Sequence, residues 1–231
     1  MIRGMLRTGS ALALVLAATA AKAETWAIEH VTLIDGLGHA PQRDMTVVVD
    51  GEKIAQVGPS ALIPKPPGRR IDGRGRYLMP GLIDAHIHLR GGVEPQADAA
   101  SARAAATQAL AGFLYAGVTT VYDAGNQADV ILPLRKAERA GQIASPRIFA
   151  TGNLITYPGS HGTEMAVTVQ DFEKDKDKLD RHLAEQQPDT VKLTLEEEGW
   201  GARPMIPLMP LPLLEDTIRY YNLHGVRATV H

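Results

Sequence analysis

The sequence contains no cysteine and almost no excess of charge of either sign. Without cysteine, neither a disulfide framework nor a thiolate metal site can form, so any metal site must use histidine, carboxylate or less usual ligands. The 24 basic and 26 acidic residues give a net charge of −2, which argues against a nucleic-acid-binding surface. After the first residues, no stretch is long and apolar enough to span a membrane. We therefore expect a globular protein with no nucleic acid partner and no membrane span.

The N-terminal residues have the pattern of a secretory signal peptide. Two arginines accompany an apolar run over residues 10–20, and Ala-Lys-Ala at 21–23 fits the small-x-small cleavage pattern. A buried N-terminal helix is the alternative, but nothing amphipathic balances the run. We expect residues 1–23 to be a signal peptide cleaved after Ala23, and the protein to be exported, with a bacterial periplasm as the expected compartment.

The segment 24–76 is predicted to be all-β. Extended runs at 26–34, 45–49 and 53–57 are separated by turn residues, and the Asp-Gly pair at 50–51 is a strong hairpin signal. These strands are too few to form a stable sandwich alone, so strands from elsewhere must complete it. We predict that this segment is the N-terminal part of a β-sandwich domain.

From residue 77 onward, strand and helix patterns alternate. Strands are expected at 82–88, 117–123, 146–151, 189–195 and 225–231. Helices are expected between them at 97–116, 128–140, 170–187 and 213–224. The alternation predicts an α/β fold with a parallel sheet, either an open doubly wound sheet or part of an eight-stranded barrel. In both folds, functional groups gather at the C-terminal ends of the strands.

Two histidines lie at such an end, in Leu82-Ile-Asp-Ala-His-Ile-His88. Side chains at i and i+2 of a strand share a face, so His86 and His88 project together, about 7 Å apart along the backbone. Two imidazoles suit Zn²⁺ or a similar borderline ion. A solvent-facing pair on an edge strand is the alternative. We expect this apolar strand to be buried, and because two unpaired polar rings are costly to bury, this favours the metal interpretation.

Three segments together resemble the amidohydrolase superfamily, in its imidazolonepropionase and Xaa-Pro dipeptidase-like branch. They are Leu33-Ile-Asp-Gly36, Met79-Pro-Gly-Leu-Ile-Asp-Ala-His-Ile-His88 and Ala116-Gly-Val-Thr-Thr-Val-Tyr-Asp123. The resemblance covers nearly all of the mature chain. It implies a metal-dependent (β/α)₈ TIM-type barrel preceded by N-terminal strands of a small β-sandwich. Residues 77–231 would then be the N-terminal part of the barrel, with about five of its eight strands.

The resemblance implies a metal-ligand set. His86 and His88 match ligands on the first barrel strand, and His231 matches a ligand on the fifth. Lys192 matches a lysine that is carboxylated and bridges two metals in binuclear members. The apolar neighbours of Lys192 support such a role, because an unpaired ammonium within a strand is costly. A lysine that reaches solvent from the strand end, and a His231 without a role, remain the alternatives.

Other polar residues are less specific. His161, in Pro158-Gly-Ser-His-Gly162, resembles a Gly-Gly-His-Gly loop whose histidine lines the substrate cleft, although a serine replaces one glycine. An ordinary loop histidine is the alternative. Asp123 either orients neighbours in the site or caps its strand. His182 and His224 fall on predicted helices and are expected to be packing or surface residues.

The resemblance implies hydrolysis of an amide, cyclic amide or dipeptide C–N bond by metal-activated water. One or two divalent ions, expected to be Zn²⁺, would be bound. Relatives also need a sixth-strand histidine and an eighth-strand aspartate that takes the proton. Both would follow residue 231, so no catalytic residue is expected within the sequence, and it is expected to be the N-terminal part of such an enzyme. The alternatives are an inactive fragment, a pseudoenzyme that at most binds metal, and a decarboxylase or isomerase of the same superfamily. Oligomerisation stays open.

Overall fold

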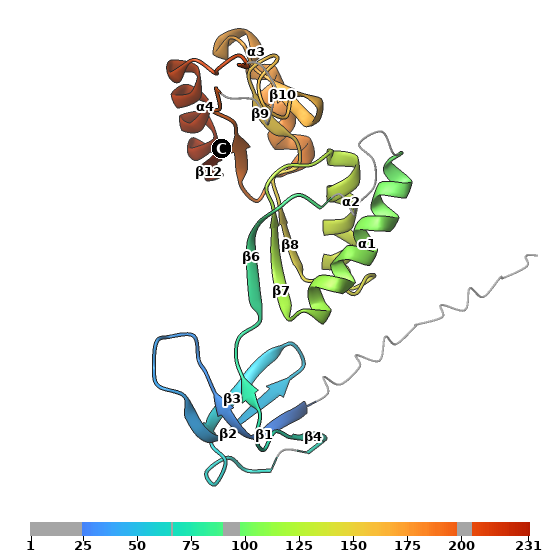
Figure 1. The fold of residues 1–231 in the computed structure, drawn as a ribbon, viewed down its shortest axis with the longest axis vertical. Coiled ribbons are helices and arrows are strands. Elements are labelled where there is room, and N and C mark those ends of the chain that lie inside the picture. The colour runs from blue at the N-terminus through green and yellow to red at the C-terminus, as the bar shows by residue number, and fades with distance from the viewer. Residues whose placement is uncertain (1–24, 66, 90–97, 198–204) are drawn as a thin grey trace, which may run out of the picture. The chain divides into compact units, whose positions relative to one another are not determined.

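A computed structural model describes residues 25–65, 67–89, 98–197 and 205–231 (Figure 1). The chain divides into two compact units, Met1–Pro80 and Gly81–His231. The predicted signal peptide lies outside the described residues. Among the helices in the described ranges, none has the length and hydropathy needed to cross a bilayer.

The first unit contains one five-stranded sheet arranged around β1. Its strands are β1 (Thr25–Leu33), β2 (Gln42–Asp50), β3 (Lys53–Pro59), β4 (Arg69–Asp72) and β5 (Tyr77–Leu78). β1 pairs antiparallel with β2 and parallel with both β4 and β5, while β2 and β3 form an antiparallel hairpin. At the hairpin turn Gly51 has φ +60°, which glycine adopts at little steric cost. The predicted strands and hairpin are therefore present, whereas the sandwich stays a prediction.

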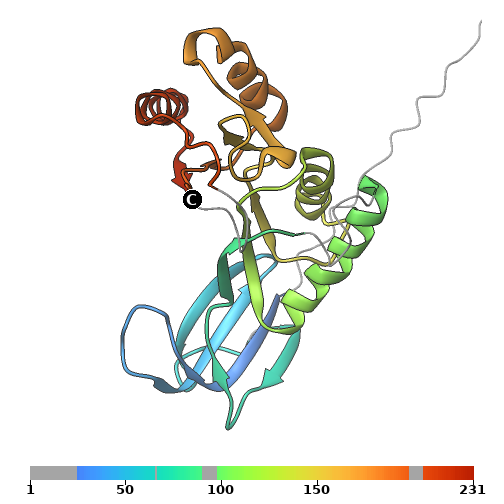
Figure 2. The ribbon, with the colours of Figure 1, turned by 45° about the horizontal axis from the view of Figure 1, so that its top comes forward.

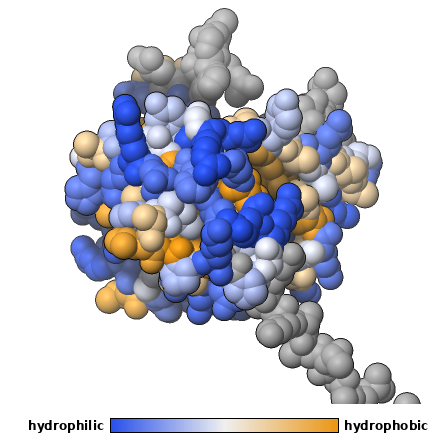
Figure 3. Space-filling view, turned by 90° about the horizontal axis from the view of Figure 1, so that it is seen from below, coloured by the Kyte–Doolittle hydropathy of each residue, from blue (hydrophilic) through white to orange (hydrophobic). Residues whose placement is uncertain are grey.

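The core of the first unit is small. Four buried side chains from β1 and β2 form it: Val31, Leu33, Met45 and Val47. On the face drawn in Figure 3, hydrophobic side chains lie in separate patches among hydrophilic ones. Scattered apolar side chains of this kind are normal for a protein surface.

The second unit is mixed α/β, and all of its strand pairs are parallel, as predicted. One sheet has the order β6-β7-β8, from β6 (Leu82–Ile87), β7 (Val118–Asp123) and β8 (Arg147–Ala150). The other has the order β10-β9-β11-β12, from β9 (Leu154–Thr156), β10 (Ala166–Thr168), β11 (Val191–Leu193) and β12 (Ala228–Val230). The helices are α1 (Ala99–Tyr115), α2 (Ala128–Arg139), α3 (Phe172–Arg181) and α4 (Leu211–Leu223), with a 3₁₀ turn η1 (Thr163–Met165) and a π-helical turn η2 (His182–Gln186).

Local sequence accounts for the helix ends. The Asp98 side chain accepts hydrogen bonds from the backbone N–H groups of Ala100 and Ser101, which satisfies two free donors at the start of α1. Gly117, at φ +83°, follows the end of the same helix, as its sequence predicted. Gly141, at φ +66°, ends α2 in the same way.

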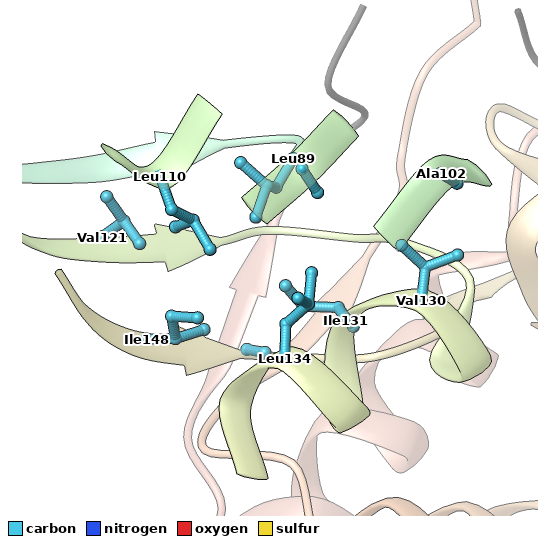
Figure 4. Close-up of a cluster of buried hydrophobic side chains, with 10 residues drawn as sticks. Leu89, Ala102, Leu110, Val121, Val130, Ile131, Leu134 and Ile148 are labelled. Carbon is cyan, nitrogen blue, oxygen red and sulfur yellow. The ribbon is translucent and has the colours of Figure 1, made fainter. Parts of the chain in front are cut away.

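Each sheet of the second unit buries apolar side chains against helices. Helices α1 and α2 cover one face of the β6-β7-β8 sheet (Figures 1 and 2). The cluster between them, drawn in Figure 4, includes Leu89, Ala102, Leu110, Val121, Val130, Ile131, Leu134 and Ile148. A second cluster joins the other sheet to α3 and α4 and includes Ile155, Val169, Leu179, Val191, Leu193, Met209, Leu213, Leu214, Tyr220 and Tyr221.

The structure differs from the sequence-based expectation in the segment 152–169, where neither a strand nor a helix was predicted. It contains β9 and β10, and β9 pairs with β11. The break between β8 and β9 falls at Gly152, whose φ of +73° is rarely adopted by residues with side chains. A Cβ there would also lie 2.3 Å from Gln186 Oε1. The third predicted strand therefore bends at Gly152 and continues as β9 into the second sheet.

The expectation that the first strand of this unit is buried is wrong. Leu82 is 50% and Ile83 is 69% exposed, and within the described residues β6 pairs only with β7. It is an edge strand there, and only its last residue, Ile87, packs against the neighbouring core cluster. The cost of burying polar rings therefore gives no support to a metal site at His86 and His88. The metal-site hypothesis has to be judged from the residues around the two histidines.

Candidate metal centre

The two histidines at the end of β6 lie side by side. Their ring centroids are 5.3 Å apart and their ring planes are inclined by 66°. His88 Nδ1 donates a hydrogen bond to the carbonyl oxygen of Gly125 at 2.8 Å, because a carbonyl can only accept. This bond places the proton on Nδ1 and leaves Nε2 as the free acceptor, the arrangement commonly found in histidines that ligate metals.

The loop that supports His88 is held by the carboxylate of Asp123, at the end of β7. Asp123 is fully buried, and it accepts hydrogen bonds from Leu89 N at 2.8 Å, Gly125 N at 3.1 Å and Asn126 Nδ2 at 3.0 Å. Burial raises the pKa of Asp123, and these donors, together with the nearby His88, oppose that rise. Asp123 therefore both caps its strand and fixes Gly125, whose carbonyl orients His88.

Lys192 lies in the middle of β11 and is only 5% exposed. Within the described ranges, its Nζ makes neither an ion pair nor a hydrogen bond. Burial lowers the pKa of Lys192, which favours the neutral amine. A neutral amine without a carboxylate partner fits the predicted carboxylation.

The predicted ligands are electrostatically coupled across the two sheets. His86 is exposed, and partial desolvation is the largest cause of its lowered pKa, which the charges of Lys192, His88 and His231 lower further. Burial also lowers the pKa of His231 most, followed by the charge of His161, with Lys192 contributing as well. The second unit therefore brings His86, His88, Lys192 and His231 within electrostatic reach of one another.

His231 follows β12 and extends its pairing with β11. Its N–H donates to Leu193 O at 2.9 Å, and its carbonyl accepts from Leu195 N at 3.1 Å. Its ring stacks on that of His161, with centroids 4.5 Å apart and planes inclined by 16°. Glu196 Oε2 lies 2.5 Å from His161 Nδ1 and 3.5 Å from His231 Nε2. One donor atom from each of these three side chains lies within 4.8 Å of the other two.

Glu196 was not singled out from the sequence, in which it follows the predicted strand at 189–195. The structure continues the ladder one step past β11, through the bond from Leu195 N to His231 O. In such an extended segment Lys192, Thr194 and Glu196 share one face. That alternation, starting from the lysine, is the sequence signal that would have found Glu196.

Two other histidines have structural surroundings. His182 Nδ1 accepts from the hydroxyl of Tyr221 at 2.8 Å, and its Nε2 donates to Asn153 O at 3.2 Å. Burial lowers the pKa of His182 to about 4. His224 is the exposed C-cap residue that follows α4, with Nδ1 2.8 Å from Tyr220 O. Both lie on the helix side of the sheet.

The donor set suits a divalent cation. Imidazole nitrogens and carboxylate oxygens are the ligands of Zn²⁺ and similar borderline ions when thiolates are lacking. Within the described part of the chain, no donor is aligned for a hydrogen bond with the buried Oε2 of Glu196. A cation is the kind of partner that such an oxygen accepts. The residues thus fit a metal, although their role as ligands stays a prediction.

A model of the amidohydrolase family matches residues 77–198, more than half of the 231-residue sequence. The chain belongs to this family. Members typically use divalent metals, and His86, His88, Lys192 and Glu196 lie in the matched segment, whereas His231 lies beyond it. The resemblance inferred from three short segments is therefore confirmed at the level of the family.

Curated relatives match this amidohydrolase over short segments. An imidazolonepropionase from Stenotrophomonas maltophilia (strain R551-3) is 40% identical over 65 residues, which cover 28% of this chain and 16% of the relative. An N-acyl-D-glutamate deacylase from Alcaligenes xylosoxydans xylosoxydans is 46% identical over 61 residues, covering 26% of this chain and 12% of the relative.

Among solved structures, a Xaa-Pro dipeptidase with methionine bound in its active site has a TM-score of 0.78 and 23% identity. The match covers 90% of this chain and 56% of that one, so the chain spans about half of the length of the dipeptidase. At this identity the likeness is one of fold.

Proposed function

We propose that this protein is a metal-dependent hydrolase that cleaves the C–N bond of an amide, a cyclic amide or a dipeptide. The proposal rests on the paired histidines at the end of β6, whose ring centroids are 5.3 Å apart, and on the buried Lys192 of β11, whose charge lowers the pKa of both His86 and His231. The deacylase and the dipeptidase among the similar proteins support an amide-type substrate. A small-molecule substrate is accordingly expected.

We further propose that residues 77–231 form about five of the eight strands of a (β/α)₈ barrel, and residues 24–76 part of a β-sandwich. The support is the parallel strands, which apart from β10 follow chain order within each sheet as β6-β7-β8 and β9-β11-β12, and the likeness in fold to the dipeptidase. Cleavage after Ala23 and export to the periplasm are part of the same proposal, and rest on the N-terminal sequence alone.

In this proposal His86 and His88 hold one ion, and Lys192 and His231 contribute to a site for one or two. A bound divalent ion supplies Lewis-acid polarisation of a carbonyl and lowers the pKa of a coordinated water to about 7. The chain's own residues supply orientation. The carbonyl of Gly125 fixes the tautomer of His88, and Asp123 holds that carbonyl in place. His161 flanks His231, where it can contact a substrate.

The test uses the full-length protein, stripped with a chelator and reloaded with Zn²⁺. N-acyl amino acids, Xaa-Pro dipeptides and a cyclic amide serve as substrates, with bound metal measured by elemental analysis. We expect activity to require the ion, and His86→Ala and His88→Ala to lose metal and on the order of 100-fold or more in activity. His224→Ala, which removes an exposed helix histidine, is the matched control. Full activity in the metal-free protein would overturn the proposal.

A further inference from the structure

We propose that Glu196 is a metal ligand that shares an ion with His231, and that His161 is a positioning residue beside them and not a ligand. The proposal rests on the metal centre of the proposed function and adds to it a carboxylate that the sequence did not suggest. It also gives His161 a role different from the predicted contact with substrate.

The distances from Glu196 to the two histidines show which histidine is placed to share an ion with it. Two ligands at 2.0–2.2 Å from a tetrahedral ion lie about 3.3–3.5 Å from each other. Glu196 Oε2 and His231 Nε2 are 3.5 Å apart, which is the separation expected of two ligands of one ion. Glu196 Oε2 and His161 Nδ1 are 2.5 Å apart, too close for two ligands of one tetrahedral ion and typical of an ion pair.

Ring orientation leads to the same assignment. An imidazole nitrogen binds a metal in the plane of its ring. The planes of His86 and His88 are inclined by 66° and can meet at an ion, whereas those of His161 and His231 are inclined by only 16° and stacked. Stacked, nearly parallel rings direct their lone pairs along nearly parallel planes. Only one of the two stacked histidines can therefore face a given ion, and the 3.5 Å distance identifies it as His231.

The backbone holds the ligand pair in register. Leu195 N donates to His231 O, so Glu196 directly follows a residue hydrogen-bonded to the segment that carries His231. Thr194 Oγ1 donates to His161 O at 3.3 Å and ties the loop of His161 to the same strand. The three side chains are thus anchored to one another by the main chain before any ion binds.

The Oε2 atom of Glu196 is ion-paired with His161 but accepts no well-aligned hydrogen bond from the described residues. Glu196 Oε2 is buried, and among residues 25–65, 67–89, 98–197 and 205–231 no donor is aligned for a hydrogen bond with it. A buried carboxylate oxygen without a hydrogen bond is costly. A cation between Oε2 and His231 Nε2 removes that cost, and it accounts for why a carboxylate occupies this position.

Glu196→Gln, in the full-length protein, tests the assignment against Glu197→Gln, the same chemical change at the exposed neighbouring residue. Affinity for Zn²⁺ is measured by calorimetry, the number of bound ions by elemental analysis, and the ligand field by the absorption of the Co²⁺-loaded protein. We expect Glu196→Gln to weaken the binding of one ion by about 10- to 100-fold and to change the Co²⁺ spectrum. Glu197→Gln should leave both unchanged.

Two further variants keep the test decisive if Glu196→Gln folds poorly. Glu196→Asp retains the charge but withdraws the oxygen, and should give an intermediate affinity. His161→Phe keeps the stacked ring without a nitrogen, and should retain the number of ions and the form of the Co²⁺ spectrum.

Each outcome has a distinct meaning. Wild-type affinity in Glu196→Gln overturns the assignment of Glu196 while leaving the proposed function intact. Loss of an ion in His161→Phe overturns the positioning role. A wild-type protein that takes up no ion overturns the metal centre itself, and this assignment with it.

Discussion

The two faces of β11 differ in how completely their polar groups are paired. On the helix side, Val191 and Leu193 are buried in the cluster formed with α3 and α4. On the opposite face, Lys192 and then Glu196 point toward the candidate metal centre. The residues alternate along one short strand, so the same backbone carries both environments.

Polar groups on the helix side are matched with partners. His182 has a partner for each ring nitrogen, and Arg135, 11% exposed at its side chain, is 2.8 Å from Asp189 just before β11. On the site side, the described residues offer neither Lys192 Nζ nor Glu196 Oε2 a hydrogen bond. The helix side is arranged for stability, whereas the site side keeps Lys192 without a partner in the described ranges and Glu196 beside two histidines, where an ion or a substrate can bind.

Asp123→Asn is expected to have the largest effect, because it disrupts a fully buried carboxylate that accepts three hydrogen bonds. The asparagine keeps the size of the side chain but replaces one accepting oxygen by an N–H₂ donor that faces backbone donors. We expect a loss of about 3–4 kcal/mol in the free energy of unfolding, measured by urea titration. Zn²⁺ affinity should fall as well, since Gly125 no longer holds His88 firmly.

Asp129→Asn is the control for that variant. It makes the same change at an exposed carboxylate in the first turn of α2. The expected loss is below about 0.5 kcal/mol, from the helix dipole alone. Equal losses in the two variants would show that Asp123 has no special role in supporting the loop.

On the helix side, the burial of His182 should make the free energy of unfolding depend on pH. Burial lowers the pKa of His182 to about 4, below its ordinary value of 6.5. The unfolded chain therefore binds a proton more readily, and stability from this group is complete above pH 6.5 and declines as the pH falls toward 4. We expect about 2–3 kcal/mol to be lost over that range, seen as the difference between wild type and His182→Gln in urea unfolding at each pH.

Glutamine is the matched replacement because it can accept from Tyr221 and donate to Asn153 but does not titrate. Parallel pH profiles for the two proteins would contradict the pairing described for His182. The comparison is made on the metal-free protein, so that pH-dependent metal binding does not contribute to the measured stability.

The sequence predicted the elements of the second unit well because each has a strong local signal. Gly117 and Gly141 end helices through their own backbone freedom, and apolar runs define β7 and β11. It could not predict that the third strand bends at Gly152 and continues as β9, because that depends on Gln186, more than thirty residues later. Tertiary contacts determined this part of the fold.

The candidate site was predictable to the extent that its residues lie in family motifs. His86, His88, Lys192 and His231 were named from the sequence, and the structure places them within electrostatic reach of one another. Glu196 was missed, because its position depends on how far the ladder runs past β11. The buried first strand was wrongly expected, because apolar composition does not distinguish an edge strand from a central one.

Lys192→Met should give the smallest change in stability and the clearest contrast between the two faces of β11. The substitution replaces an unpaired buried amine by an apolar side chain of similar length, so the metal-free protein should gain about 1–2 kcal/mol in urea unfolding. The same variant should lose metal affinity, because methionine can be neither carboxylated nor charged.

Lys174→Met, at a side chain that is 82% exposed, is the control and should shift stability by less than about 0.5 kcal/mol. A Lys192→Met protein that is less stable than wild type without metal would show that the amine is paired after all, and the two faces of the strand would then be alike. A gain in stability together with a loss of metal would show that the site side retains Lys192 for binding at a cost to the fold.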